Sequence, residues 1–496
     1  MPERPNILFI LSDDHGHWGM GCAGNSEIRT PNLDKLAARG TRFDSAFCAS
    51  PVCSPARMSI FTGKIPSQHG VHDWLAKGHL DEAVLSKELR DAFQQPEPSW
   101  EYAWPKRQLQ GDKAIRFLDG HDTFTRHLAD GGYTCGLSGK WHMGDSYTPQ
   151  AGFTYWKTTA MGGENYYYPV MLEGEEMTLK RGVYITDLIT DNALRFLEEQ
   201  KGAANPFYLS VHYTAPHAPW QREHHPAAFY DLYDGCPFAS VPDVPPHPWS
   251  DLKDKTPEEM AVLRRTYLQG YFAAVTAMDA GIGRILDALE AAGQLSNTLV
   301  IFSGDNGMSM GHHGIFGKGN GTFPMNMYDS AVKVPLIWSH PGRAREGAVC
   351  EELVSHYDLF PTILEWAGLP CTPNPALPGV SFAPLLTGEK SSVRDDVVVF
   401  DEYGPVRMVR TKEWKYIHRY PYGPHELYDL VRDPGEERNL IDDPAAQSVK
   451  ERLIDRLNHW YAAYADPACD GKGEAVHDLG QLRRIGPASG GKPAFI

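Results

Sequence analysis

The stretch CSPAR, residues 53–57, places a cysteine, a proline and an arginine at close spacing, and Cys48 lies five residues before Cys53. Three chemistries are open to this pattern: a redox pair of the two cysteines, half of a metal site, or a single cysteine that undergoes a special chemical change. A redox pair would need neither the proline nor the arginine. The other polar motifs of the chain must decide between these chemistries.

Two pairs of oxygen-bearing side chains each follow a short apolar run. Asp13-Asp14 comes after NILFILS and Asp305-Asn306 after TLVIFS, and a glycine follows closely in both cases. Hard divalent cations prefer several oxygen ligands of this kind. One pair alone would more often be a turn or loop cap, but two pairs at strand ends favour a metal site. No Cys/His spacing typical of zinc accompanies them.

Cationic and imidazole side chains lie at similar positions. Lys140 and His142 follow the apolar run YTCGLS, His217 follows PFYLSVH, and His313 and Lys318 come shortly after the second acidic pair. A single His or Lys is more often structural or solvated. Several of them at strand ends, beside carboxylates, predict a clamp for an oxyanion that includes proton donors.

The elements that must position these residues alternate between strands and helices up to about residue 380. The expected strands are 6–12, 133–138, 206–212, 298–303 and 334–339, and the expected helices are 30–40, 121–132, 186–200 and 265–292. This alternation predicts an α/β fold with a large, mostly parallel sheet covered on both faces. Ligands bind at the carboxyl ends of strands in such sheets, so we expect the polar motifs to converge on one site.

The pattern changes near residue 390. Short strands at 397–400, 407–410 and 415–418 and a closing helix at 451–464 predict a smaller α+β subdomain with an antiparallel sheet. We therefore divide the chain into a catalytic domain at 1–388, a C-terminal subdomain at 389–470, and a glycine-rich, charged tail at 471–496.

Aromatic residues gather in two loop-like insertions. The first, 71–118, contains Trp74, Trp100, Tyr102 and Trp104, and the second, 162–171, reads GGENYYYPVM. Aromatic rings of this kind could stack on a sugar or an aryl group, or could be ordinary packing residues. The sequence leaves both interpretations open.

The overall charge restricts the partners of the chain. Lys plus Arg number 47 against 63 Asp plus Glu, giving a net charge of −16, which argues against a nucleic-acid or anionic-membrane surface.

The N-terminal residues lack the pattern of a signal peptide, and no apolar run approaches the ~20 residues of a membrane span. Eight scattered cysteines are too few for a disulfide framework. We therefore expect a cytoplasmic protein.

Together these motifs resemble a known family. CSPAR followed by Thr62-Gly63 is similar to the signature C-x-P-[SA]-R-x₄-T-G of the type I, formylglycine-dependent sulfatases of the alkaline phosphatase superfamily. The resemblance continues along most of the chain through SDD, TPNLDKLAARG, GKWHMG, TAPHAP, GDNG with HHG and GKG, and ELYDLVRDPGEERNL. It implies an alkaline-phosphatase-like α/β sandwich with a small C-terminal α+β domain, in agreement with the pattern of strands and helices.

The resemblance also implies a chemical change at Cys53. In this family a maturation enzyme oxidises the cysteine to Cα-formylglycine, and Ser54 and Ala56 would be recognised by that enzyme. The ligands of a Ca²⁺ ion, with Mg²⁺ second, would be Asp13, Asp14, residue 53, Asp305 and Asn306. The hydrated aldehyde supplies one hydroxyl that attacks sulfur and another that expels sulfate.

Further roles follow from the resemblance residue by residue. Arg57 would hold the diol, and Asp305 would accept its proton. Lys140, His217 and Lys318 would surround the sulfate, with His217 or Lys318 protonating the leaving oxygen, His142 taking the second diol proton, and His313 lying near the sulfate.

The implied function is hydrolysis of a sulfate monoester to an alcohol and inorganic sulfate. The expected substrate is a sulfated sugar or glycan fragment, or an aryl or steroid sulfate. A phosphonate or phosphate ester hydrolase of the same superfamily is the alternative, since both reactions need a metal and cations around a tetrahedral anion. The expected protein partner is the maturase. His15 and His17 are expected to be structural loop residues.

Overall fold

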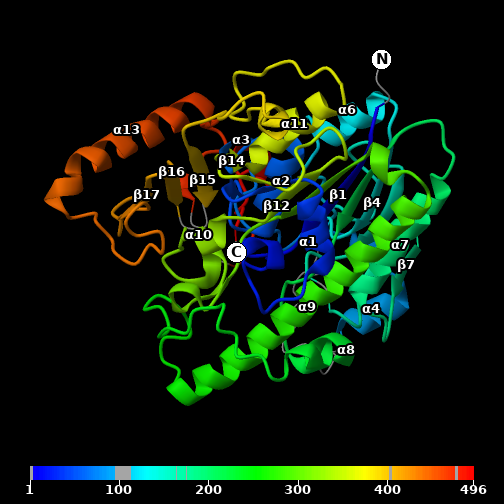
Figure 1. Ribbon diagram of the computed structural model, residues 1–496, viewed down its shortest axis with the longest axis horizontal. Coiled ribbons are helices and arrows are strands. Elements are labelled where there is room, and N and C mark those ends of the chain that lie inside the picture. Colours follow the sequence, from blue (N-terminus) through cyan, green and yellow to red (C-terminus); the bar gives the residue numbers. More distant parts are fainter. Residues whose placement is uncertain are drawn as a thin grey trace.

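A central sheet flanked by helices forms the main body, and a smaller unit lies at one side (Figure 1). The computed structural model describes residues 4–94, 113–163, 165–174, 176–401, 405–474 and 479–495. Figure 1 shows the smaller unit in orange at the left, with its helix along the outer edge. This arrangement confirms the predicted α/β fold with a separate C-terminal sheet.

The central sheet has ten strands, and five adjacent ones at its centre, β9, β1, β8, β4 and β5, run parallel. In sheet order the strands are β13 (Ala348–Cys350), β2 (Thr41–Phe43), β12 (Leu336–Ser339), β9 (Thr298–Gly304), β1 (Asn6–Ser12), β8 (Phe207–His212), β4 (Thr134–Gly139), β5 (Tyr155–Thr159), β6 (Val170–Glu173) and β7 (Glu176–Leu179). Strand β12 is antiparallel to β9, and β6 and β7 extend the opposite edge as antiparallel strands. The sheet is therefore mixed, with a parallel centre.

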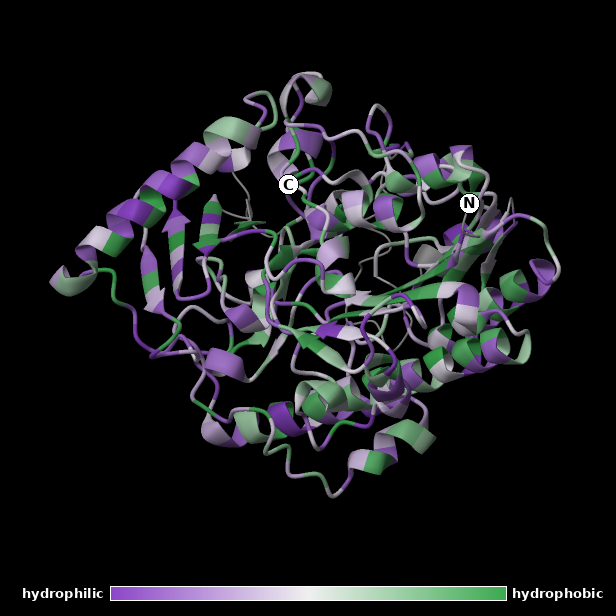
Figure 2. Cartoon of the chain, turned by 45° about the horizontal axis from the view of Figure 1, so that its top comes forward, coloured by the Kyte–Doolittle hydropathy of each residue, from purple (hydrophilic) through white to green (hydrophobic). Residues whose placement is uncertain are grey.

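The apolar run of β1 is continuous because both of its faces are buried. Ile7, Phe9 and Leu11 belong to one hydrophobic cluster, whereas Leu8 and Ile10 belong to another on the opposite face. Figure 2 shows the central strands mainly in the hydrophobic colour. Burial on both faces fixes the register of β1, and with it the position of the acidic pair that follows.

Helices cover each face of the sheet. Against the cluster that contains Leu8 pack α1 (Pro31–Ala38), α7 (Ile185–Glu199) and α9 (Pro257–Ala291). Against the cluster that contains Phe9 pack α2 (Cys53–Thr62), α6 (Phe124–Asp130) and α11 (Leu359–Trp366). Further helices of this domain are α3 (Pro66–His69), α4 (Lys87–Gln94), α8 (Ala227–Tyr230), α10 (Asp329–Val332) and α12 (Ala383–Thr387).

Helix α9 begins eight residues before the predicted start at 265, because its N-terminus is capped. The Thr256 hydroxyl accepts from the Glu259 backbone N–H at 3.2 Å, and the Glu259 carboxylate accepts from the Thr256 N–H at 2.8 Å. Pro257 is the first helical residue. This reciprocal capping box satisfies backbone donors at the helix start, so the polar first turns remain helical.

The C-terminal subdomain contains a four-stranded antiparallel sheet, β15 (Val397–Asp401), β16 (Val406–Arg410), β17 (Trp414–Arg419) and β18 (Glu426–Asp429). Three of these strands were predicted, and β18 was not. Helix α13 (Gln447–Tyr464) packs on the sheet through Leu453 and Leu457. The described part of the segment predicted as a tail lies against the main domain, where Gln481 forms a bridge with Leu75.

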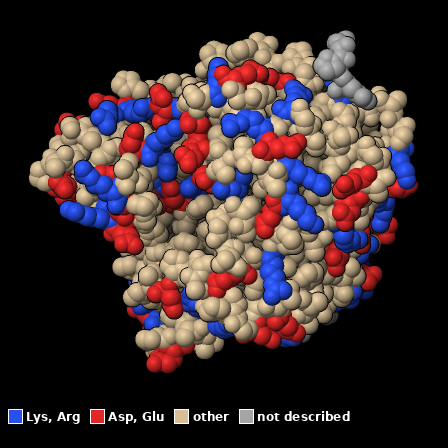
Figure 3. All heavy atoms as spheres, in the orientation of Figure 1, with Lys and Arg blue, Asp and Glu red and all other residues tan. Residues whose placement is uncertain are grey.

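The surface bears charges of both signs. In Figure 3, Lys and Arg are interspersed with Asp and Glu over the face that is shown. Within the described residues, no helix has the length and apolar character required to cross a membrane.

Candidate active site

The polar motifs meet at the carboxyl ends of the parallel strands. Ser12 of β1 is in register with Gly304 of β9, so the acidic pairs that follow lie side by side. On the other side of β1, Gly139 of β4 is in register with His212 of β8. The sheet therefore brings together four segments that are far apart in the sequence, as the strand-end argument predicted.

The acidic pairs form a buried, interlinked cluster. The Asp305 Oδ1 atom accepts hydrogen bonds from the backbone N–H groups of Asp14 at 3.2 Å and Asn306 at 2.9 Å. The Asn306 side-chain amide donates to Asp14 Oδ1 at 2.8 Å. Two buried oxygens, Asp13 Oδ1 and Asn306 Oδ1, have no hydrogen-bond partner. Such unpartnered buried oxygens are the donor atoms that a hard cation takes.

Cys53 lies at the edge of this oxygen cluster, at the first position of α2. Donor atoms of Asp13, Cys53 and Asp305 lie within 4.8 Å of one another, and so do those of Asp14, Cys53 and His217. A helix N-terminus favours negative charge. The location suits a group that becomes anionic beside a cation.

The thiol of Cys53 is not activated in this environment. Burial raises its pKa to about 11, although Lys140 and Lys318 oppose the shift. A thiol with such a pKa holds little thiolate at neutral pH and is a weak nucleophile. The position is therefore poorly suited to ordinary cysteine catalysis.

Cations pair with the carboxylates around Cys53. The Lys318 ammonium lies 2.5 Å from Asp14 Oδ1 and 3.0 Å from Cys53 Sγ. The Lys140 ammonium donates to Asp13 Oδ2 at 2.6 Å. The third buried cation, Arg57, binds Asp305, and the His217 Nε2 atom lies 3.5 Å from Asp14 Oδ2.

These charges shift the pKa values of Asp13 and Asp305 in opposite directions. Burial works against ionisation of Asp13, but the cations, with Lys140 foremost, outweigh it and hold the pKa of Asp13 well below its ordinary value. Burial and the Asp13 carboxylate raise the pKa of Asp305 to about 7. A divalent cation between the two would keep both carboxylates ionised.

Arg57 is placed by the helix that carries Cys53. The two residues are four apart on α2, so their side chains share one face of the helix. The guanidinium donates through Nε to Asp305 at 2.9 Å and through Nη1 to the Lys140 carbonyl at 2.9 Å. Its Nη2 atom is buried without a hydrogen-bond partner, which leaves a charged donor for a further ligand.

His142 is held in an unusual backbone conformation, with a φ of 55°. Its Nε2 atom faces the Leu75 carbonyl at 3.3 Å, and its buried Nδ1 has no hydrogen-bond partner. Burial, reinforced by Lys140 and His79, keeps the pKa of His142 well below its ordinary value. At neutral pH the ring is therefore uncharged and can accept a proton.

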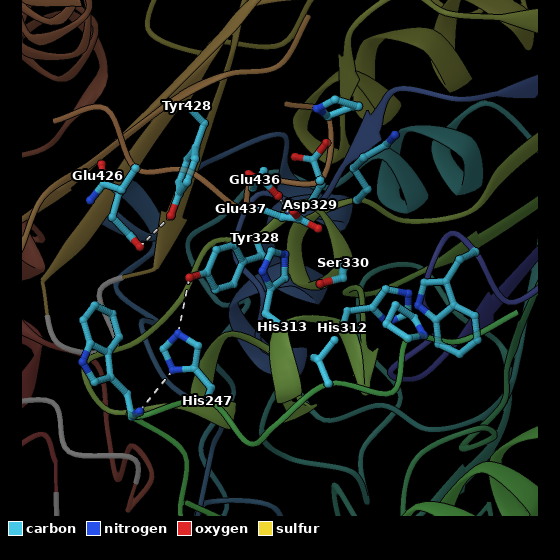
Figure 4. Close-up of a pocket in the computed structure, with 18 of the residues that line it drawn as sticks. His247, His312, His313, Tyr328, Asp329, Ser330, Glu426, Tyr428, Glu436 and Glu437 are labelled. Carbon is cyan, nitrogen blue, oxygen red and sulfur yellow. Dashed lines mark hydrogen bonds between the residues drawn. The ribbon is translucent and has the colours of Figure 1, made fainter. Parts of the chain in front are cut away.

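His313 lies in the lining of another cavity, of about 820 Å³, which none of the residues around Cys53 lines among those described. Figure 4 shows His313 beside Tyr328, and the two rings are stacked with centroids 3.7 Å apart. Burial lowers the pKa of His313 to about 4. His313 thus lines a cavity that Lys140, His217 and Lys318 do not line, and its place near the sulfate stays a prediction.

The other predicted positions are distributed as follows. His15 is buried and satisfied, with Nδ1 at 3.2 Å from Ser12 Oγ and Nε2 at 2.9 Å from the Gly19 carbonyl. His17 lines the same cavity as His313. Trp74 lies in the described part of the first insertion, whereas Trp100, Tyr102 and Trp104 fall outside the described residues.

Two supporting residues escaped the sequence analysis. His212, the last residue of β8, is buried, and its Nδ1 lies 3.0 Å from the Lys140 carbonyl that Arg57 also binds. The Tyr271 hydroxyl donates to the Asp14 carbonyl at 3.1 Å and accepts from the Gly16 N–H at 3.0 Å. His212 ends a strand and fits the same strand-end signal, but Tyr271 lies in the middle of α9 and no local signal marks it.

Comparison with known families identifies this arrangement. A family model described as Sulfatase matches residues 5–369, most of the chain. The chain belongs to the sulfatase family. A second model, described as N-sulphoglucosamine sulphohydrolase, C-terminal, matches residues 311–463 and covers the predicted subdomain as far as residue 463. The protein is therefore a sulfuric ester hydrolase, as the motifs predicted.

Relatives of this sulfatase are similar over nearly the whole chain. An N-acetylglucosamine-6-O-sulfatase of Bacteroides thetaiotaomicron is 27% identical over 95% of this chain and 88% of its own length. An arylsulfatase of Clostridium perfringens is 26% identical over 97% of this chain and 100% of its own. A solved structure of a protein with its substrate D-glucosamine-2-N,6-O-disulfate has a TM-score of 0.74 and 26% identity, over 95% of this chain and 100% of that one.

Proposed function

We propose that this sulfatase removes sulfate from sulfated sugars at the Cys53 cluster, with Cys53 converted to formylglycine and a Ca²⁺ ion held by the acidic pairs. The observation that supports this proposal is that charged side chains converge on Cys53 Sγ. Lys318 Nζ lies 3.0 Å from the sulfur, and donor atoms of Asp13 and Asp305 lie within 4.8 Å of it and of each other.

The residues fit a hard cation. Asp13, Asp14, Asp305, Asn306 and residue 53 would hold Ca²⁺, with Mg²⁺ the second choice, because the residues other than Cys53 offer oxygen. The unpartnered Oδ1 atoms of Asp13 and Asn306 support this assignment. A bound cation would supply Lewis-acid polarisation of a sulfate oxygen.

The raised pKa of the Cys53 thiol supports formylglycine at this position, since the thiol itself is a weak nucleophile. A separate maturation enzyme would oxidise the cysteine to the aldehyde. The aldehyde hydrate would supply one hydroxyl for attack on sulfur and a second for expulsion of sulfate. Cys53 Sγ marks where these oxygens would lie.

The surrounding residues would bind the substrate and transfer protons. Arg57 offers its spare Nη2 donor to a hydroxyl at position 53. Lys140, His217 and Lys318 would bind the sulfate oxygens, with His217 or Lys318 protonating the leaving oxygen. His142 would accept a proton at Nδ1 when sulfate is expelled.

Sugar sulfates are favoured as substrates by several of the relatives whose names give a substrate. One acts as an N-acetylglucosamine-6-O-sulfatase and another is an ulvan-active sulfatase of Formosa agariphila, 26% identical over 94% of this chain and 82% of its own length. The arylsulfatase relative makes an aryl sulfate the second candidate.

A substrate panel on matured protein tests the proposal. We expect inorganic sulfate to be released from a glucosamine 6-O-sulfate with a higher kcat/KM than from 4-nitrophenyl sulfate, and little turnover of the phosphonate ester 4-nitrophenyl phenylphosphonate. Mass spectrometry of the peptide that contains Cys53 should show the aldehyde form about 18 Da lighter than the thiol form. Preferred turnover of the phosphonate, or an active enzyme that contains only the thiol, would overturn the proposal.

A further inference from the structure

The Leu75 carbonyl fixes which nitrogen of His142 can accept a proton. This carbonyl accepts from His79 Nε2 at 2.8 Å and faces His142 Nε2 at 3.3 Å. A carbonyl can only accept, so both Nε2 atoms must carry the proton. A neutral imidazole has one donor and one acceptor, and His142 is therefore left with a bare Nδ1, the buried atom without a partner.

Leu75 belongs to a loop, residues 70–76, whose backbone is held largely by one distant side chain. Gln481 is fully buried. Its Oε1 accepts from the backbone N–H groups of His72 at 2.7 Å and Asp73 at 3.1 Å, and its Nε2 donates to the Gly70 carbonyl at 2.7 Å.

The backbone of Gln481 completes the attachment. Its N–H donates to the Trp74 carbonyl at 2.8 Å, and its carbonyl accepts from the Ala76 N–H at 3.0 Å, so these bonds lie on either side of Leu75. The Leu75 N–H donates to the Ser54 hydroxyl at 3.1 Å, next to Cys53. Loop 70–76 is thus tied both to the C-terminal segment and to the residue beside the reacting position.

We propose that Gln481 is a positioning residue for His142: it holds loop 70–76 so that the Leu75 carbonyl binds His142 Nε2 and leaves Nδ1 free to accept a proton. This inference rests on the role of His142 in the proposed function. The segment predicted as a tail thereby contributes to catalysis without contact with the reacting atoms.

A mispositioned His142 should slow only the expulsion of sulfate, the step after the alcohol has left. In matured Gln481→Ala, we expect 4-nitrophenol release from 4-nitrophenyl sulfate to begin with a burst equal to the enzyme concentration. Sulfate should then appear with a kcat lower by about tenfold, a fraction of what a general base contributes. Since kcat/KM reports steps up to the first irreversible one, it should change much less than kcat.

Two variants provide matched comparisons. Gly162 packs against His142, since a Cβ on Gly162 would lie 2.0 Å from His142 Nε2, so Gly162→Ala should produce the same burst and the same fall in kcat. Gln269→Ala removes another buried glutamine, one that donates to the Tyr230 carbonyl at 3.1 Å, and should show neither effect. If the burst amplitude and the kcat of Gln481→Ala fall by the same factor, the substitution only causes misfolding, and the inference is overturned.

A measurement that does not depend on turnover separates this inference from the proposed function. In unmatured, ¹⁵N-histidine-labelled protein, the imidazole signals absent from His142→Asn should show the Nε2–H form in the unchanged chain and a shift or mixture of tautomers in Gln481→Ala. An unchanged tautomer and kcat in Gln481→Ala would overturn the inference. If His142→Asn itself shows no burst and an unchanged kcat, the proposed role of His142 fails instead.

Discussion

Two buried charge clusters in this molecule look alike electrostatically, yet they differ in what they leave unpaired. Around Cys53, the pKa of Asp13 is held far below its ordinary value and that of Asp305 is raised to about 7. Between the main domain and the C-terminal sheet, the pKa of Asp329 is likewise held low and that of Glu436 is raised to about 7. Perturbed pKa values alone therefore do not separate a catalytic cluster from a structural one.

The hydrogen bonds separate them. The Lys415 ammonium is shared by Asp329, Glu436 and the Met327 carbonyl, and the second oxygen of Glu436 accepts from the Asp329 N–H at 2.6 Å. Glu436 Oε1 accepts no hydrogen bond but forms an ion pair with the Lys415 ammonium. The cluster of Lys415, Asp329 and Glu436, called here the interdomain cluster, therefore pairs its own charges. The Cys53 cluster instead leaves oxygens of Asp13 and Asn306 without partners. Unused ligand atoms, and not charge alone, indicate function.

The largest expected effect is at position 53. Cys53→Ala should lower turnover of matured protein by on the order of 10⁴-fold or more, because the reacting group is removed. The unfolding temperature should change little. Cys48→Ala, at a buried cysteine five residues earlier, should retain activity. Measured turnover of Cys53→Ala close to that of the unchanged enzyme would contradict the assignment of this cluster as the reacting one.

Equivalent lysine substitutions test the two clusters against each other. Lys140→Met should lower kcat/KM by about 10²–10³-fold, because a cation at the sulfate oxygens is lost. Lys415→Met should instead lower the free energy of unfolding by about 3–5 kcal/mol, since it leaves buried carboxylates uncompensated, while the folded fraction keeps its kcat/KM. Assays and chemical denaturation on both variants measure this, and the reverse pattern would break the comparison.

Substrates with different leaving groups can show whether His217 or Lys318 donates a proton or only binds sulfate. A sugar alkoxide needs a proton as it leaves, whereas a nitrophenolate needs little help, and general acid catalysis contributes about 10²–10⁴-fold. At least one of His217→Ala and Lys318→Ala should therefore lose much more kcat/KM on a sugar sulfate than on 4-nitrophenyl sulfate. Equal losses on both substrates, for both variants, would show that these residues only bind sulfate.

Calcium should stabilise the protein only by binding at the Cys53 cluster. At about 100 times its Kd, Ca²⁺ should add about 2.7 kcal/mol to the free energy of unfolding of the unmodified chain. The same increment is expected for Lys415→Met, and none for Asp14→Ala. Thermal unfolding after treatment with a chelator and after addition of Ca²⁺ measures this difference. A Ca²⁺ increment that survives in Asp14→Ala would place the ion elsewhere.

The smallest effect concerns His313, which lines the cavity of about 820 Å³. The pKa of His313 is lowered to about 4 by burial, so its unfolded form takes up protons first and stability is lost as the pH falls from about 6.5 towards 4. His313→Phe preserves the stack on Tyr328 and should reduce this acid loss by on the order of 1 kcal/mol. The kcat/KM of His313→Phe should stay within about twofold of that of the unchanged enzyme. A much larger fall would indicate that His313 lies at the sulfate site.

The strand-end argument predicted that the two acidic pairs, Lys140 and His217 would converge, and the family resemblance added Cys53, Arg57 and Lys318. Neither predicted how these side chains are oriented. Runs such as NILFILS are long and apolar enough to identify buried strands, and polar residues after parallel strands must share one edge of the sheet. The capping box at Thr256 was equally readable, and it was overlooked when the start of α9 was predicted from apolar spacing alone.

The sequence by itself determined the family, the parallel core and the set of reactive residues, because these depend on motifs and on local periodicity. Tertiary structure alone decided the rest. It placed His313 in the lining of a cavity that Lys318 does not line, although the two residues are only five positions apart, and it joined Gln481 to loop 70–76 across about four hundred positions. Both outcomes depend on long-range packing and on which buried polar groups find partners, and neither follows from local sequence.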